Sequence, residues 1–491
     1  MKVQKVQTQV QPHPFYQPER TTAVSHRRLI LRCLPCVMFA TVPLGGLAQP
    51  NSLSPNTAIE SQRLGTPNGG WLPLPSFKFI PIPGAQKASE SDAQSPKRPP
   101  SQQRIVDLNT AGEYQTVGTA GLELMAKEKP DDELQLIIAN SLAWTGRLRA
   151  AIPAYEALTS GPLASAAQVG LANVHRWRGR DDIAKPLYDK VLAVEPENPD
   201  AIEGLELANR ELSPRTLIEV GGSTDSTDNK RRILTTNHRW RDQSGAKIYE
   251  VEASGVQDSL PGIEAAQQEV TLRHHDLSLE LKPSLELSMP TRYDHSLYAS
   301  GAIKLADDQI TLEAGRVNWS RIATNPNALR ASLAATHLGA SATQDFSMGT
   351  VQGKLHYYNI TDGNTIFTTN LHLASVWRPL GDHFKPFAGI ETRSAKFNTS
   401  NYWSPELGSG ILYAGLLGEW GDSNSNLFAS AQLGSGIYGE AGSSWSISAG
   451  GKHWLSNDVA IGMNLWAMSS WRDGSVYKAQ SVNLNLEKLW R

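Results

Sequence analysis

The sequence holds few residues whose types and spacing suit metal chemistry. His274-His275-Asp276 is a dense group of potential metal ligands. Adjacent residues of a strand point to opposite faces, however, so the two imidazoles could not share an ion there, and we expect a turn instead. Cys33 and Cys36 have the C-x-x-C spacing of redox and metal sites. Both lie in a segment that we expect to be removed, and we predict no metal site and no cofactor.

Catalytic motifs are equally sparse. The sequence has no G-x-S-x-G motif, and Ser404, which precedes Pro405, has no base that can be assigned to it. A triad assembled from distant positions is the alternative, as in an outer-membrane acyltransferase or lipase. We expect a protein that is not an enzyme.

A second group of side chains would suit the lining of a pore that conducts a solute. Acidic, basic and aromatic residues recur at every second position of segments whose other positions are apolar. Such residues would line an aqueous lumen and guide a neutral or cationic chain, or would merely be solvated inward residues. The candidates are Glu250, Glu252, Glu280, Glu286, Glu313, Lys354, His356 and Tyr358.

Composition limits the class of protein that positions them. The 491 residues include 46 basic and 48 acidic ones, so no excess of positive charge indicates a nucleic-acid partner. The mean hydropathy of −0.35 and the lack of a long apolar run beyond the N-terminus argue against a helical membrane protein. Neither observation excludes a β-barrel, whose strands alternate apolar and polar residues.

The N-terminus has the features of an export signal. Arg27, Arg28 and Arg32 precede an apolar stretch that ends in Gly46-Leu47-Ala48, with small residues where a signal peptidase cleaves. We predict a signal peptide over 1–48, which contains both cysteines. Residues 49–105 are rich in Pro, Ser, Gln and Gly, and we predict a disordered linker there.

A repeat defines the next segment. Gly146, Ala151 and Tyr155 recur thirty-three residues later as Gly179, Ala184 and Tyr188, followed by Pro196. This period is close to that of tetratricopeptide repeats, in which glycine permits the turn between two helices and alanine lets the helices approach. We predict tetratricopeptide-like helical repeats over 106–213, with a final capping helix near 200–212. These residues are expected to serve packing and, through the repeats as a whole, to recruit a periplasmic protein.

From residue 214 to 491 the period changes to two. Leu277, Leu279 and Leu281 alternate with polar residues, and Val351, Gly353, Leu355 and Tyr357 do so again. Segments of about ten such residues, separated by turns, indicate a transmembrane antiparallel barrel. A soluble sandwich shows the same alternation. The barrel is favoured by aromatic residues near strand ends and by a final strand that alternates Val482, Leu484 and Leu486 with polar residues.

Sixteen strands fit this segment. An even number places both barrel ends in the periplasm, so the odd-numbered connections face outward, the longest of them at 257–265, 320–329 and 398–408. A bulge is expected near Arg316, where alternation is lost. The predicted strands are 215–223, 231–241, 246–256, 266–275, 277–288, 295–305, 309–319, 330–341, 347–360, 365–377, 384–397, 409–420, 426–438, 444–454, 459–470 and 476–490.

The Gly146 and Gly179 repeats, the domain order and the stretch Tyr402-Trp403-Ser404-Pro405 resemble those of exopolysaccharide export porins, in which periplasmic tetratricopeptide repeats precede a C-terminal barrel. The resemblance covers residues 110–491 and implies a conduit in the bacterial outer membrane that passes a polysaccharide chain. It also implies contact with outer-membrane lipid. Two alternatives stay open: a surface or phage receptor that acts through its outer loops, and a non-conducting barrel whose repeats recruit a periplasmic partner.

Overall fold

The computed structural model describes residues 98–491 apart from 292–294, 307, 324, 347–348, 376, 378–379, 381–382, 423 and 473. The predicted signal peptide and most of the predicted linker lie outside the described residues. The linker prediction also ran too far, because a helix begins at Pro100. Among the described residues, no helix has both the length and the apolar character needed to cross a membrane.

Residues 98–213 form helices joined by short turns. The helices are α3 (Pro100–Thr110), α4 (Tyr114–Met125), α5 (Asp132–Trp144), α6 (Leu148–Glu156), α7 (Ala164–Trp177), α8 (Asp181–Val194) and α9 (Pro199–Leu212). Gly146 and Gly179 occupy the turns before α6 and α8 with φ of +81° and +73°, which glycine adopts without strain.

The thirty-three-residue repeat of the sequence is also a repeat of contacts. Tyr155 donates a hydrogen bond to Asn140 Oδ1 at 2.6 Å, and Tyr188 donates one to Asn173 Oδ1 at 2.7 Å. Both tyrosine rings are fully buried. A Cβ on Gly170 would lie 2.3 Å from the ring of Tyr155, and one on Gly204 would lie 2.4 Å from Tyr188. Each tyrosine therefore fills a gap that the glycine of the following helix leaves open. The helices repeat as pairs, as expected; their membership of the tetratricopeptide class stays a prediction.

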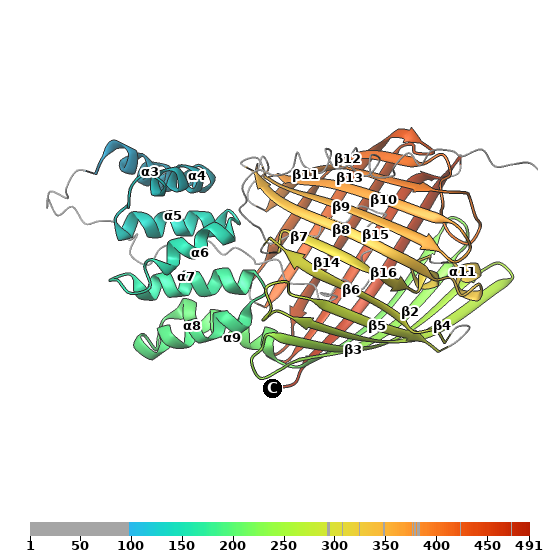
Figure 1. The fold of residues 1–491 in the computed structure, drawn as a ribbon, viewed down its shortest axis with the longest axis horizontal. Coiled ribbons are helices and arrows are strands. Elements are labelled where there is room, and N and C mark those ends of the chain that lie inside the picture. The colour runs from blue at the N-terminus through green and yellow to red at the C-terminus, as the bar shows by residue number, and fades with distance from the viewer. Residues whose placement is uncertain are drawn as a thin grey trace, which may run out of the picture. The chain divides into compact units, whose positions relative to one another are not determined.

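The C-terminal segment is a closed barrel of sixteen antiparallel strands, in which each strand pairs with its neighbours in sequence and β1 pairs with β16 (Figure 1). The strands are β1 (Arg215–Asp225), β2 (Lys230–Arg241), β3 (Lys247–Leu260), β4 (Ile263–Asp276), β5 (Ser284–Pro290), β6 (Tyr298–Leu305), β7 (Ile310–Val317), β8 (Ala335–Phe346), β9 (Gly349–Ile360), β10 (Thr365–Ser375), β11 (Phe384–Ala395), β12 (Ser409–Gly421), β13 (Ser425–Gly439), β14 (Ser444–Trp454), β15 (Val459–Arg472) and β16 (Ser475–Leu489). The predicted strand number is confirmed.

Four details of the predicted barrel were wrong. The expected strand at 330–341 begins only at Ala335 and runs to Phe346, because the chain is helical up to Arg330. The expected loop at 257–265 is a tight hairpin that turns at Pro261-Gly262, since Leu260 already pairs with Ile263. The expected strand at 277–288 starts only at Ser284, after a turn in which Lys282 has a φ of +39°. No bulge occurs at Arg316, because both neighbouring strands pair in unbroken register; the alternation is lost because the strand ends at Val317.

His274 and His275 lie in β4 rather than in the predicted turn. They do point to opposite faces, as two adjacent strand residues must. His274 stacks on Tyr249 with ring centroids 4.7 Å apart, whereas the side chain of His275 is buried on the other face.

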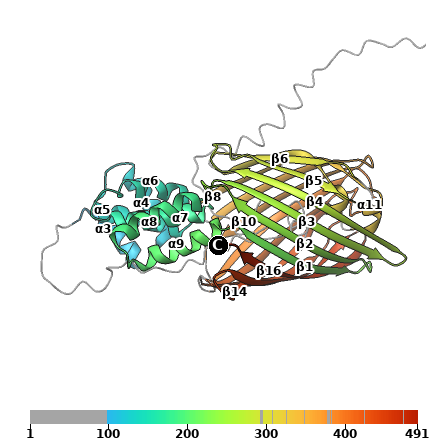
Figure 2. The same ribbon diagram turned by 90° about the horizontal axis from the view of Figure 1, so that it is seen from below.

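The long connection between β7 and β8 is not an open loop. It contains two short helices, α10 (Trp319–Ile322) and α11 (Pro326–Arg330). Asn325 caps α11 by accepting a hydrogen bond from the backbone of Asn327, and Pro326 supplies a first helical residue that needs no donor. Leu329 of α11 is fully buried against Val256 and Ala265, so α11 packs on the β3–β4 hairpin at one end of the barrel (Figure 2).

Candidate functional site in the barrel lumen

The two faces of the barrel strands differ in chemistry. On β3 the side chains of Glu250 and Glu252 are 6% and 8% exposed, whereas that of Val251 between them is 37% exposed. The same alternation runs around the barrel. The apolar side chains exposed on the outer face include Val220, Leu234, Leu272, Leu285, Leu312, Leu338, Leu355, Phe367, Leu371, Leu412, Leu433, Ile447, Ile461, Leu465 and Leu484. An apolar outer face and a polar inner face are what a barrel in lipid requires.

One wall of the lumen, formed by β2 to β5, carries a network of paired charges. Arg273 lies 2.8 Å from Glu252, 2.6 Å from Glu286 and 3.8 Å from Glu250. Arg239 adds a second cation 3.6 Å from Glu250. Because each buried carboxylate faces a guanidinium, this wall does not present a free acidic surface.

Arg231 and Asp258 form a separate buried pair on the same wall. Their charged atoms are 3.1 Å apart and their side chains are 2% and 0% exposed. Asp258 can therefore belong to a strand of the barrel, because its side chain faces inward and its charge is matched by Arg231 on the neighbouring strand.

The β7–β8 connection reaches this wall. Arg321 places its guanidinium 2.7 Å from Glu252 and 3.5 Å from Glu269. Asn318 donates to the side chains of Gln267 and Glu269 at 3.1 Å each. All these partners are inward-facing residues of β3 and β4, so the segment folds into the lumen.

Aromatic contacts hold the other side of the same segment. Trp319 is fully buried, with its ring 4.9 Å from that of Tyr358 on β9 and 5.4 Å from that of Tyr402. Residues 318–334 apart from 324, which we call the lumen segment, therefore contact both the β3–β4 wall and β9. A segment that touches two separated parts of the wall narrows the lumen between them.

The stretch Tyr402 to Pro405 anchors the neighbouring β11–β12 connection. The Tyr402 hydroxyl donates to Asp362 at 2.8 Å, and Ser404 Oγ accepts from the backbone of Thr399 at 2.8 Å. The Pro405 carbonyl accepts from Ala395. The short motif thus fixes a loop over the same end of the barrel as the lumen segment.

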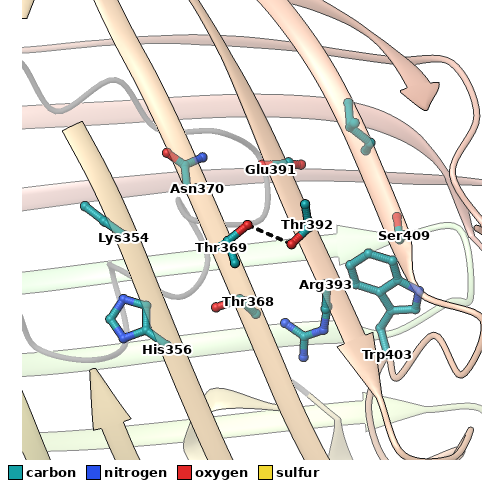
Figure 3. Close-up of a pocket in the computed structure, with 11 residues that line it drawn as sticks. Lys354, His356, Thr368, Thr369, Asn370, Glu391, Thr392, Arg393, Trp403 and Ser409 are labelled. Atoms are coloured by element: carbon teal, nitrogen blue, oxygen red, sulfur yellow. Dashed lines mark hydrogen bonds between the residues drawn. The ribbon is translucent and has the colours of Figure 1, made fainter. Parts of the chain in front are cut away.

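A small open recess lies on the wall formed by β9 to β12 (Figure 3). Thr369 and Thr392 are hydrogen-bonded at 2.8 Å between its strands. Strand β11 is eight strands from β3 in the closed order, so the recess faces the charged wall across the lumen. It is lined by Lys354, His356, Thr368, Thr369, Asn370, Glu391, Thr392, Arg393, Trp403, Ser409 and Ile411.

The predicted lumen residues fall into three groups. Glu250, Glu252 and Glu286 belong to the charged network. The side chains of Glu313, Lys354, His356 and Tyr358 occupy the inward positions of β7 and β9 and are partly or fully buried. Glu280 is the exception: it is exposed on the turn between β4 and β5, because the predicted strand does not form there.

Sequence reasoning missed the cations that pair with the predicted acids. Arg273 lies directly across from Glu250 in the β3–β4 register, which the alternation of both strands could have indicated. Arg321 carried no such signal, since it lies in a connection, and its partners on β3 and β4 are some fifty to seventy residues away.

Comparisons with known proteins concern the barrel. No protein-family model matches the sequence, and a comparison with curated proteins finds no match. Among solved structures, a bacterial polysaccharide outer membrane secretin matches with 12% identity and a TM-score of 0.46, covering 56% of this chain and 98% of its own.

Two further structures match more weakly. The outer membrane protein OprD from Pseudomonas aeruginosa has 9% identity and a TM-score of 0.33, covering 56% of this chain and 93% of its own. The CymD monoaromatic hydrocarbon channel has 10% identity and a TM-score of 0.30, covering 58% and 91%. None of these likenesses assigns a function to this chain.

Proposed function

We propose that this protein is an outer-membrane barrel whose lumen is a conduit for an exopolysaccharide chain. The observation that carries the proposal is the closed barrel of sixteen strands with an apolar outer face and a polar inner one. A barrel of this strand number is wide enough to enclose an aqueous path. The outer face suits lipid, and the inner face suits a hydrated solute.

The distribution of charge in the lumen favours an uncharged or weakly charged chain. On the β2–β5 wall the acids and arginines neutralise one another and also hold the lumen segment. The facing recess offers hydroxyl, amide and carboxylate groups from Thr368, Asn370 and Glu391, together with the ring of Trp403. Sugars use both kinds of contact, since their hydroxyls exchange hydrogen bonds and their C–H faces pack on aromatic rings.

The proposed orientation of the barrel in the membrane follows from the strand number. Because sixteen is even, β1 begins and β16 ends at the same end of the barrel, and α9 leads directly into β1. In the proposed orientation this end faces the periplasm, the helical repeats bind a periplasmic protein there, and the lumen segment lies toward the outer mouth.

Current block by sugar oligomers tests the choice of solute. The full chain is reconstituted in planar bilayers, and N-acetylglucosamine oligomers are added while the ionic current is recorded. We expect transient blocks whose duration falls about 2- to 12-fold in Glu391→Gln, which removes one charge-bearing hydrogen-bond acceptor from the recess. Trp403→Ala is expected to shorten them as well.

Glu280→Gln is the matched control, because it removes the same charge from an exposed turn outside the recess. Its blocks should last as long as those of the native protein. Oligomers that leave the current unchanged would contradict polysaccharide as the solute while leaving the conduit itself intact.

A further inference from the structure

Three side chains with metal-ligating atoms meet on the inner face of β7 to β9. They are Glu313, His337 and His356, and their ligand atoms all lie within 4.8 Å of one another. His337 Nε2 and His356 Nδ1 are 3.0 Å apart. Neither His337 nor the cluster was expected from the sequence, because the three residues are separated by nineteen or more positions.

Strand register explains how they meet. Glu313 pairs with Gly339 on β8, and Gly339 pairs with His356 on β9, so these three positions form one row across the sheet. His337 lies two residues before Gly339 and therefore on the same face. A carboxylate and two imidazoles thus surround a position that has no side chain.

The glycine at the centre keeps this position open. A Cβ on Gly339 would lie 2.9 Å from His356 Nδ1 and 3.0 Å from His337 Nε2. The two ring nitrogens, which are hydrogen-bonded to each other, therefore lie directly above Gly339. The side chain of any other residue at this position would press on both of them.

The orientation of the imidazoles is held by stacking. The ring of His337 stacks on Tyr358 at 4.7 Å with an interplanar angle of 14°, and on His356 at 5.3 Å and 19°. Tyr358 in turn packs against Trp319 of the lumen segment. These contacts hold both imidazoles beside Glu313, so little further ordering of the side chains is needed when an ion binds.

We infer that Glu313, His337 and His356 bind a divalent ion of the zinc type. Two imidazole nitrogens bound to a tetrahedral zinc ion are about 3.3 Å apart, close to the separation seen here, and two histidines with one glutamate are a known zinc ligand set. Three protein ligands leave a fourth position open toward the lumen. The inference needs only the barrel fold and does not depend on conduction.

The ammonium group of Lys354 competes with a bound metal ion for the Glu313 carboxylate. Lys354 lies on β9, two residues before His356 and on the same face, and it interacts electrostatically with Glu313. Its ammonium group repels a bound cation and attracts the carboxylate that would bind it. Removing this charge should tighten the site, an effect that loss of structure could not produce.

The test is zinc binding to the full chain, purified in detergent without a histidine tag and stripped with a chelator. Zinc is titrated in competition with a chromophoric chelator, and cobalt is used to record the visible spectrum of a tetrahedral site. We expect one ion per chain, affinity lower by about tenfold or more in His337→Ala and His356→Ala, and higher affinity in Lys354→Met.

Gly339→Ala keeps all three ligands and should also lose zinc, because its methyl group would lie 2.9 and 3.0 Å from the two ring nitrogens and displace them. His372→Ala is the control: His372 is a buried inward histidine on β10 that contacts Tyr413 instead. If an alanine variant fails to fold, as judged by heat-modifiable migration, His356→Gln and Glu313→Gln take its place. Absence of zinc binding in the native protein would overturn the inference, as would native zinc affinity in the folded Gly339→Ala and His356 variants.

Discussion

At the scale of single residues, Arg321 determines whether the lumen segment stays in place. Its guanidinium faces Glu252 and Glu269, whose side chains are 11% and 5% exposed. Removing one partner of a buried ion pair costs about 3–5 kcal/mol when the other charge stays buried without compensation. Arg321→Ala does this to Glu269, whereas Glu252 keeps Arg273 at 2.8 Å. We expect Arg321→Ala to release the segment, raising single-channel conductance and letting trypsin cleave the backbone after Arg330, which the folded segment otherwise protects.

The control for this variant is Arg330→Ala. Arg330 lies in the same segment, but it donates to the backbone carbonyl of Glu264 at 2.8 Å and is exposed. Its loss leaves no buried charge, so conductance should match that of the native barrel. Equal conductance in both variants would mean that the ion pairs of Arg321 do not hold the segment.

At the scale of elements, the helix pairs depend on glycines that admit tyrosine rings. Alanine at position 170 would bring a Cβ to 2.3 Å from the ring of Tyr155, which cannot move because it is fully buried. Overpacking of this kind costs about 1–3 kcal/mol. Gly170→Ala should therefore lower the temperature at which the full chain loses its helical circular dichroism.

Gly118→Ala is the matched variant. Gly118 is also helical, but a Cβ there would lie 3.2 Å from a methyl group of Leu142 and 3.8 Å from Arg147 Nη1, a much milder contact than the 2.3 Å at Gly170. Alanine stabilises a helix by about 0.5–1 kcal/mol relative to glycine, so this variant should melt at the same temperature or slightly higher. A Gly170 variant as stable as the Gly118 variant would contradict the packing described for Tyr155.

The strands were predictable from sequence, whereas the lumen segment was not. Alternation reports on the two environments of each strand, so it located the strands to within a few residues except near 257–265, 277–283 and 330–346. It failed because Leu277, Leu279 and Leu281 alternate within a turn, because Asp258 has the residue type of a loop although it pairs with Arg231 inside the barrel, and because Arg330 belongs to α11 and β8 begins five residues later. A connection such as 318–334 has no period, and its fold is set by contacts with distant strands.

The candidate site was predictable only in part for the same reason. Inward acids follow from alternation, which places Glu250 and Glu252 on one face. Their cations on other strands follow only from register, and the meeting of Glu313, His337 and His356 requires the register of three strands at once.

At the scale of the whole molecule, one buried carboxyl in the helical part should make stability depend on pH. Burial, together with the nearby carboxylate of Glu211, raises the pKa of Asp181 to about 7. Its Oδ1 has no hydrogen-bond donor within the described part of the chain. Because the folded state then holds a proton that the unfolded state releases above about pH 4, stability falls as the pH rises from 4 to 7 and levels off above that.

Asp181→Asn removes this ionisation. We expect the variant to be more stable than the native chain at pH 8 and to lose the decline in melting temperature between pH 4 and 7. Thermal melts of the full chain at both ends of this range provide the comparison. A decline of the same size in the variant would assign the pH dependence to other groups.

The conductance of the purified full chain in a planar bilayer shows whether a polar path runs through the closed barrel and is narrowed by the lumen segment. We expect discrete current steps for the native protein. We expect larger steps for Arg321→Ala, in which the lumen segment is no longer held to Glu252 and Glu269. A folded barrel that passes no current in either form would contradict this expectation and would favour the receptor or the non-conducting structural barrel.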